Sequence, residues 1–516
     1  MNLSLVLGLV VAIAILGVGL AGHFEIVALS YLQNYTLAIM LLGATLAIQV
    51  TVWAMREKGW SLMHILRLIG FPVRISMPLD LDKRYKCRSP DISLHAKCLY
   101  LGNKLKHYLP LLMFSAFHIF NFQRMSISLV DVYFSRTSGI LMGLLPYRDF
   151  PLEYPPLSLI VLLPPHLLAQ NPAQYARLFT YEMLFLDLMT MFLVTALASK
   201  LGRSKWQVLS VYTVALMFMG FLPAARYDLL PTVLVLWAIF SFTRQNYTLC
   251  WAGLALATTA KLYPIILVPF LCIWQIYRRD YRRMTKGIAV FTAIISIFVI
   301  PWVILAPEGF INFFQYHAAR GLQVESTYAS VLMVLEQLGL GSLEVSFSYG
   351  SWNLVSPVAD ILAKASIPLL LLSLAGILIL YIHRLKKSCH YYDERSAAHL
   401  IVSSEMLVYW VLAVIGWLIT NRVFSPQFLI WLLPLVPIVN GKRRWIVWLL
   451  FIAIVTMTRY VFPYNYSALI SLQTLPVGVL VGRNMLLILL GYLVFKWGRL
   501  PSDTCVSDIQ HWAKWR

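Results

Sequence analysis

Charged residues are scarce in this 516-residue chain: Asp, Glu, Lys and Arg together make up 12% of it, whereas hydrophobic residues make up 60%. A mean hydropathy of +0.74 excludes an ordinary soluble globule. Apolar runs of about 20 residues recur along the chain, and each is long enough to cross the hydrocarbon core of a bilayer as a helix. The sequence therefore predicts an all-α fold, a polytopic transmembrane helical bundle surrounded by the lipid bilayer.

Acidic residues and cysteines are fewer still. The 22 Asp and Glu stand against 42 Lys and Arg, which gives a formal net charge of +20. Such an excess can indicate nucleic-acid binding, but these cations lie in loops between apolar runs, where membrane topology accounts for them, so we expect no nucleic-acid partner. The 6 cysteines contain no CxxC pair and predict neither a zinc site nor a disulfide framework. A nucleotide-binding Walker loop is also missing.

Loops rich in Lys and Arg set the predicted topology, because such loops stay in the cytoplasm. The segment 56–106 carries eleven Lys or Arg against four acids, and it follows two apolar helices, 3–21 and 34–54, that we interpret as a retained hairpin. Further basic clusters should also lie inside: 200–205, 278–286, 384–387, 442–444 and 496–499. About fourteen helices satisfy this alternation. After the hairpin they are expected near 107–122, 178–199, 206–222, 230–243, 247–259, 263–277, 284–304, 357–381, 401–420, 427–440, 445–461 and 474–497.

The same alternation gathers most of the remaining polar residues on the outer face. These are Asp131, Asp149, Glu153, Arg226, Asp228, Lys261, Arg320, Glu325, Arg422 and Ser425. The proline-rich segment 154–168 is too short for a confident span, and we interpret it as an interfacial helix on that face. Arg483 falls inside a predicted span, at 474–497.

Cations and carboxylates on one face favour chemistry on a lipid-linked phosphate. Arg and Lys neutralise phosphate oxygens through charge-assisted hydrogen bonds, and a carboxylate can deprotonate an attacking hydroxyl. Simpler interpretations remain for single residues: Lys261 can extend to the interface, and Arg226 can pair with Asp228. Together the residues favour glycosyl transfer from a lipid phosphate that reaches the site within the membrane.

The first of five notable blocks of sequence comprises DVY at 131–133 and GLLPYRDFPLEYPPL at 143–157. This block resembles the first outer loop of glycosyltransferase family 87, a family of the GT-C superfold. The others follow in the family's order: RYDLLP at 226–231, AKLYPIILVP at 260–269, RGLQVEST at 320–327 and FSPQFLIWLLP at 424–434. The resemblance covers residues 107–440.

The resemblance implies an inverting transferase that moves a hexose, by default mannose, from a polyprenyl-phosphate donor to a lipid or glycan acceptor outside the cytoplasmic membrane. Asp131 matches the proposed catalytic base. We assign the donor phosphate to Lys261, Arg320, Arg226 and Arg422, and we expect no metal ion and no cofactor. Substrate-binding or supporting roles fall to Tyr133, Asp149, Glu153, Tyr154, Asp228, Tyr263, Gln323, Glu325, Ser425 and Gln427.

Three regions are expected in the multi-pass protein of the plasma membrane. Residues 1–106 form the hairpin and basic segment, residues 107–440 form the catalytic membrane core, and residues 441–516 form C-terminal helices with a short cytoplasmic tail. The alternative is a secondary transporter or a lipid-linked sugar flippase, since these also have many helices and intramembrane charges. Transporters place their sites near the midplane between internal repeats. We find no internal repeat here, and the polar residues gather at one rim.

Overall fold

The structure of the protein is a computed structural model that describes residues 110–123, 130–388, 396–441 and 443–498. The chain divides into two compact units, Met1–Arg124 and Met125–Arg516. In the first unit, residues 110–123 are helical. The predicted hairpin and the basic segment 56–106 lie outside the described residues.

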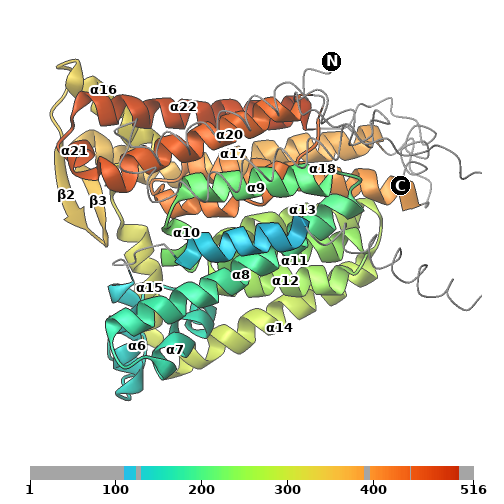
Figure 1. Cartoon of the computed structure of the whole chain (residues 1–516), viewed down its shortest axis with the longest axis horizontal. Coiled ribbons are helices and arrows are strands. Elements are labelled where there is room, and N and C mark those ends of the chain that lie inside the picture. Colours follow the sequence, from blue (N-terminus) through green and yellow to red (C-terminus); the bar gives the residue numbers. More distant parts are fainter. Residues whose placement is uncertain (1–109, 124–129, 389–395, 442, 499–516) are drawn as a thin grey trace, which may run out of the picture. The chain divides into compact units, whose positions relative to one another are not determined.

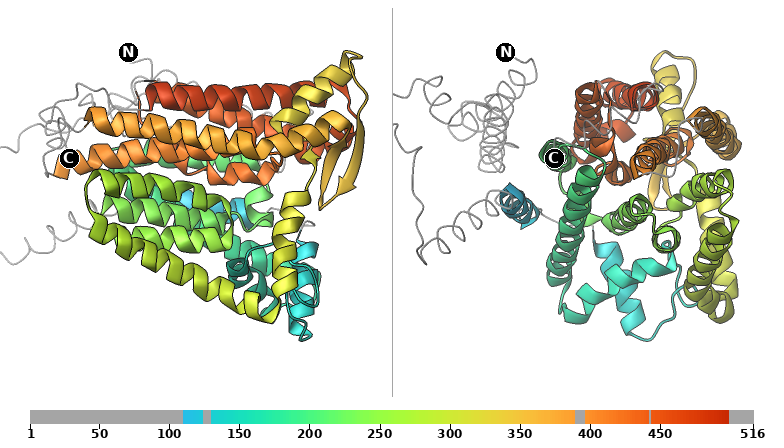
Figure 2. Two further views of the ribbon diagram at one scale, coloured as in Figure 1. Left: turned by 180° about the vertical axis from the view of Figure 1, so that it is seen from behind. Right: turned by 90° about the vertical axis from the view of Figure 1, so that its right-hand side faces the viewer.

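The second unit is an α-helical membrane bundle, as the sequence predicts. Among the described residues, six helices are long and apolar enough to cross a membrane. They are α8 (Pro172–Lys200), α14 (Tyr281–Leu305), α17 (Pro357–Ser388), α18 (Ser396–Thr420), α20 (Arg444–Arg459), which continues into η5 (Tyr460–Tyr464), and α22 (Thr474–Trp497). Figure 2 shows these helices lying side by side.

Shorter helices fill the space between the long ones. They are α9 (Lys205–Met219), α10 (Leu222–Ala225), α11 (Leu229–Thr243), α12 (Tyr247–Ala260), η2 (Tyr263–Leu267), α13 (Val268–Tyr277), α16 (Thr327–Gln337), η4 (Pro426–Trp431), α19 (Leu435–Ile438) and α21 (Tyr466–Ile470). Helix α11 is apolar on nearly every side and almost wholly buried, which is expected for a helix at the centre of a bundle. Gly287 of α14 packs on the Trp251 ring of α12, and a Cβ there would lie 2.1 Å from the ring.

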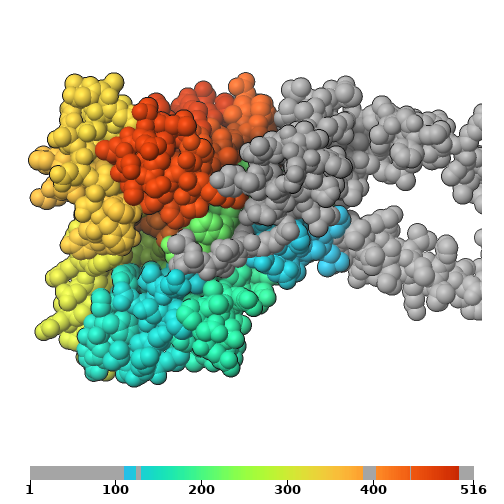
Figure 3. Space-filling view, turned by 60° about the vertical axis from the view of Figure 1, so that its left-hand side comes forward, coloured from blue at the N-terminus to red at the C-terminus, as the bar shows by residue number. Residues whose placement is uncertain are grey.

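Several small elements gather at one end of the long helices (Figure 1). They include α6 (Asp131–Leu141), η1 (Pro156–Ser158), α7 (Leu159–Leu168) and α15 (Pro307–Ala319). Helix α7 contains 10 residues, two of them prolines, which is too short to span a bilayer. Figure 3 shows a hollow on one face of this end, between the cyan segment of α6 and α7 and the red C-terminal helices.

A small antiparallel sheet at the same end was not expected from the sequence. It contains β1 (Leu322–Gln323), β2 (Glu344–Ser348) and β3 (Ser351–Val355) in the order β1-β3-β2. The hairpin turn consists of Tyr349 and Gly350, whose φ values of 50° and 69° are both positive, as a two-residue turn of type I′ requires. Through β1 and β3, the sheet holds the residues next to Arg320.

Candidate functional site

Four cations that the sequence singled out follow the C-terminal ends of four different helices. Arg226 ends α10, Lys261 ends α12 and Arg320 ends α15, while Arg422 lies two residues after α18. The C-terminal end of a helix carries partial negative charge, which favours a cation there. Lys261 is close enough to Arg226 and Arg320 to be repelled by both, and Arg320 is similarly affected by Arg422. The fold therefore concentrates positive charge from distant segments.

Lys261 lies against a buried carboxylate and three aromatic rings. Its Nζ is 2.5 Å from Asp228 Oδ1, and the Trp431 Nε1–H donates to the same oxygen at 2.7 Å. The Nζ also lies 5.0 Å from the ring centroid of Tyr227, 5.2 Å from that of Phe428 and 5.4 Å from that of Trp431. These distances allow cation–π attraction, so the lysine is held by both a charge and a cage of rings.

Arg226 contacts several of the predicted supporting residues. Its Nε donates to Gln427 Oε1 at 3.1 Å, and its guanidinium carbon lies 6.0 Å from the centre of the Tyr133 ring. Tyr133 packs on Tyr154 with ring centroids 5.5 Å apart. Nearby, Tyr263 stacks on Trp431 at 3.8 Å. Ser425 precedes η4 and does not cap it through its side chain.

Arg320 and Arg422 are joined through backbone and side-chain hydrogen bonds. The Arg320 Nη2 donates to Ser351 Oγ of β3 at 3.0 Å, and the Arg422 Nη1 donates to the carbonyl of Arg320 at 3.2 Å. The Gln323 backbone N–H donates to the carbonyl of Arg422 at 3.0 Å. Burial lowers the pKa of the Arg320 guanidinium, and the charge of Arg422 adds to this effect. An anion bound here would relieve the repulsion.

Arg483 of α22 supports this segment, a role that the sequence did not predict. Its side chain is 1% exposed, and its Nη2 donates to the backbone carbonyl of Glu325 at 2.9 Å. The guanidinium carbon lies 4.0 Å from the centre of the Phe424 ring. The neighbouring Asn484 donates from Nδ2 to the carbonyl of Ser326 at 3.3 Å. A single turn of α22 therefore holds the segments that follow Arg320 and Arg422.

Glu325 is a buried acid within this network. Its Oε2 accepts a hydrogen bond from Gln323 Nε2 at 2.9 Å and a longer one from the Tyr466 hydroxyl at 3.5 Å. Burial raises the pKa of Glu325 to about 8, although Arg483 and Tyr466 act in the opposite direction. The side chain is thus largely protonated at neutral pH and is poorly suited to accept a proton.

Two acids of the first outer loop are paired. Asp149 accepts from the adjacent Arg148 Nε at 2.9 Å, and this pair is exposed. Glu153 pairs with Arg136, a residue that the sequence analysis did not select. The His317 Nε2–H donates to the backbone carbonyl of Glu153 at 3.1 Å. Burial lowers the pKa of His317 to about 4, helped by the charge of Arg320.

Asp131 differs from these acids. It is the first residue of α6 and is exposed, whereas Tyr133 and Thr137 face the interior from another side of the helix. No hydrogen bond or ion pair joins the Asp131 carboxylate to another residue in the described part of the chain. Its side chain is exposed at the start of α6, and the structure does not place the carboxylate in contact with the four cations.

The positive charge at this end suits an anionic substrate. Within the described ranges, no group of three or more His, Cys, Asp or Glu side chains could hold a metal. Arginine and lysine are instead the side chains that bind phosphate through charge-assisted hydrogen bonds.

A family model described as glycosyltransferase family 87 matches residues 152–413. The chain belongs to glycosyltransferase family 87. The part that matches family 87 contains Glu153, Arg226, Lys261 and Arg320, while Asp131 precedes it and Arg422 follows it. No curated protein and no solved structure matches the chain. The family and the apolar helices together make the protein a membrane glycosyltransferase.

Proposed function

We propose that this family 87 protein transfers a hexose, with mannose as the first candidate, from a polyprenyl phosphate to a lipid or glycan acceptor. The observation that carries the proposal is the convergence of Arg226, Lys261, Arg320 and Arg422 at the end of the bundle where α6 presents Asp131. A polyprenyl-phosphate donor lies in the membrane through its lipid chain and offers its phosphate to these cations. No nucleotide or cofactor takes part.

The reaction is a direct displacement at the anomeric carbon. An acceptor hydroxyl oxygen forms the new bond to that carbon and gives its proton to the Asp131 carboxylate. The bond between the anomeric carbon and the phosphate oxygen breaks, and its electron pair leaves with the polyprenyl phosphate, so the configuration inverts. Asp131 is our choice of base because Asp149, Glu153 and Asp228 are held in ion pairs and Glu325 is largely protonated.

Arg320 and Arg422 are the favoured ligands of the leaving phosphate. Each guanidinium has five N–H donors, and the bonds to Ser351 and to the Arg320 carbonyl use one donor of each. The remaining donors can follow the negative charge as it grows on the phosphate, which is where preorganised electrostatics contribute most to rate. Lys261 contributes longer-range positive charge, because Asp228 already pairs with it, and Arg226 supports the site beside Gln427.

The distribution of basic loops supports an outer location for the site. The clusters at 200–205 and 278–286 connect α8 to α9 and α13 to α14. Basic loops of this kind remain cytoplasmic. Along the chain, the four cations follow helix ends that lie opposite to these basic loops. We therefore assign the site to the outer face of the plasma membrane.

Transfer from a defined donor tests the proposal. Purified protein in nanodiscs without divalent metal is incubated with radiolabelled polyprenyl-phosphate mannose and a native lipid extract. We expect a labelled glycolipid with the wild type, and a rate about 10²–10⁴-fold lower with Asp131→Asn, the usual range for losing a general base. Ser135→Ala is the matched control, because Ser135 is an exposed residue one turn further along α6. Inertness of the wild type towards every polyprenyl-phosphate sugar would refute the function.

A further inference from the structure

Helices α9 and α20 pack against each other, and both begin at the end of the bundle that carries the basic loops. Their first turns are joined by a hydrogen bond from Arg444 Nη2 to Gln207 Oε1 at 3.0 Å. Ser204 precedes α9 and Arg443 precedes α20, and neither side chain caps its helix. The N-terminal end of a helix carries partial positive charge, so this pair of helix ends favours an anion.

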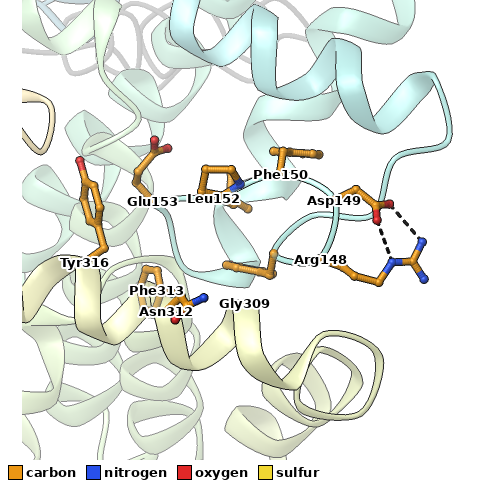
Figure 4. Close-up of a pocket in the computed structure, with 11 residues that line it drawn as sticks. Arg148, Asp149, Phe150, Leu152, Glu153, Gly309, Asn312, Phe313 and Tyr316 are labelled. Atoms are coloured by element: carbon orange, nitrogen blue, oxygen red, sulfur yellow. Dashed lines mark hydrogen bonds and ion pairs between the residues drawn. The ribbon is translucent and has the colours of Figure 1, made fainter.

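Four cations belong to the starts of these two helices: Arg203, Lys205, Arg443 and Arg444. We call them the α9–α20 basic cluster. Among the described residues, no ion pair joins any member of this cluster to a carboxylate. Arginines elsewhere are compensated: Arg148 pairs with Asp149, as Figure 4 shows, and Arg283 at the start of α14 pairs with Asp280. The α9–α20 basic cluster thus concentrates positive charge without an internal acid.

Arg203 does not behave as an arginine that only fixes membrane topology, which would extend into water. Its Nη2 donates to Oγ of the buried Ser404 on α18 at 3.1 Å, and its buried Nε has no hydrogen-bond partner in the described part of the chain. Burial lowers the pKa of the Arg203 guanidinium to about 10, and the charge of Arg444 acts in the same direction. A phosphate would neutralise both arginines through charge-assisted hydrogen bonds.

The surface beside the α9–α20 basic cluster is apolar. Trp445 and Leu449 lie one turn apart on α20, and they are 47% and 49% exposed. The Arg444 guanidinium carbon lies 5.5 Å from the centre of the Trp448 ring, and Lys205 Nζ lies 4.7 Å from that of Trp206. Tryptophan is enriched at the depth of lipid headgroups. A soluble phosphate gains nothing from this apolar surface, whereas the acyl chain of a lipid can pack along it.

We propose that the α9–α20 basic cluster binds the phosphate of an anionic phospholipid, whose acyl chains lie along the exposed side of α20. Arg203 and Arg444 bind the phosphate, and Lys205 and Arg443 add positive charge. The cytoplasmic leaflet, to which basic loops are assigned, is also the one rich in anionic lipid. This lipid is not a substrate, so the inference does not depend on the proposed function. Its phosphate links α9 to α20 and, through Arg203, to α18.

Photo-crosslinking tests the location of the lipid. A phosphatidylglycerol that carries a diazirine next to its headgroup is incorporated with the protein into phosphatidylcholine nanodiscs and irradiated, and labelled peptides are mapped by mass spectrometry. We expect labels in residues 203–207 and 443–449 that unlabelled phosphatidylglycerol reduces and inorganic phosphate does not. Reduction by inorganic phosphate would assign the cluster to a soluble anion and overturn the inference. Equal labelling of residues 278–286 would indicate a general attraction of basic loops to anionic lipid and would also overturn it.

Arg203→Gln makes the test specific, with Arg282→Gln as its control. Both changes remove one positive charge from a basic loop, but Arg282 is exposed on α14, outside the cluster. Losing a charge-assisted hydrogen bond should reduce labelling about 10-fold in Arg203→Gln, and Arg282→Gln should match the wild type. Arg444→Gln supplies an independent variant should Arg203→Gln fold poorly. Unchanged labelling in both cluster variants, or an equal loss in Arg282→Gln, would contradict the proposal.

Thermal unfolding separates lipid binding from a purely structural role of Arg203. Short-chain phosphatidylglycerol should raise the Tm of the detergent-solubilised protein more than short-chain phosphatidylcholine does. This difference should disappear in Arg203→Gln and persist in Ser404→Ala, which removes the hydrogen bond to Ser404 but keeps the cation. A wild type that does not distinguish the two lipids, or a difference that Arg203→Gln retains, would refute the site.

Discussion

Lys261 and Asp228 form an ion pair in which Nζ and Oδ1 are 2.5 Å apart, and the carboxylate is wholly buried while the lysine is 16% exposed. The two residues belong to separate sequence blocks, at 226–231 and 260–269. Their pairing gives the group of four cations, Arg226, Lys261, Arg320 and Arg422, a fixed internal anion. The lysine predicted to hold phosphate thus also neutralises a buried acid.

Breaking this pair should destabilise the protein strongly. Lys261→Met leaves Asp228 as an uncompensated buried charge, which typically costs about 3–5 kcal/mol. The double variant Lys261→Met/Asp228→Asn should recover most of the loss, because no buried charge remains. Arg148→Ala is the control: its pair with Asp149 is exposed and worth about 0–1 kcal/mol. Thermal unfolding in nanodiscs measures all three, and equal losses for Lys261→Met and Arg148→Ala would contradict the role of burial.

Arg422 should act on donor binding. Arg422→Ala removes charge-assisted hydrogen bonds to phosphate, each worth about 1.5–3 kcal/mol, and we expect KM for the donor to rise roughly 10- to 100-fold. Arg244→Ala provides a matched arginine, because Arg244 also follows a helix C-terminus but is exposed after α11. Initial rates over a range of donor concentrations decide the matter. Our phosphate assignment fails if both variants behave as the wild type.

Arg483 should act as a positioning residue. Arg483→Met removes the hydrogen bond to the Glu325 carbonyl and should destabilise the protein by about 1–3 kcal/mol, the usual cost of an unsatisfied buried group. We also expect a higher KM for the donor, with Arg483→Lys partly restoring it. Lys496→Met is the control on the same helix, since Lys496 is exposed. A loss of stability with an unchanged donor KM would indicate a structural role alone.

Glu325 should make stability depend on pH. Its pKa rises from 4.5 to about 8 through burial, so across this window the folded protein retains a proton that the unfolded chain releases. The free energy of unfolding therefore falls as pH rises from 4.5 towards 8, by at most about 1.4 kcal/mol per pH unit. Glu325→Gln should flatten this slope in thermal unfolding, whereas Glu344→Gln, exposed on β2, should not. A slope that both variants retain would rule Glu325 out as its source.

The sequence predicted the membrane helices well because apolar runs report burial in lipid directly. The expected span 474–497 coincides with α22, and the span 357–381 falls within α17. The β2–β3 hairpin was missed because its strands are short and one of them is mostly exposed, so they carry little alternation of polar and apolar residues.

Contacts between distant segments were also beyond sequence reasoning. RYD at 226–228 suggested that Asp228 pairs with Arg226, but the structure pairs it with Lys261. The sequence did not indicate a partner for Arg483, because its hydrogen bond joins residues separated by 158 positions. The sequence indicated which residues carry charge, and only the fold shows which charges meet.

Arg483 also relates the site to the order in which the helices of the chain are synthesised. Helix α22 is the final transmembrane helix of the described chain, so Arg226, Lys261 and Arg320 leave the ribosome well before the side chain that holds the loop after β1. A nascent protein inserted only as far as α20 would have its cations but lack the contacts from Arg483 and Asn484. Completion of the proposed donor-phosphate site is thereby coupled to the insertion of α22.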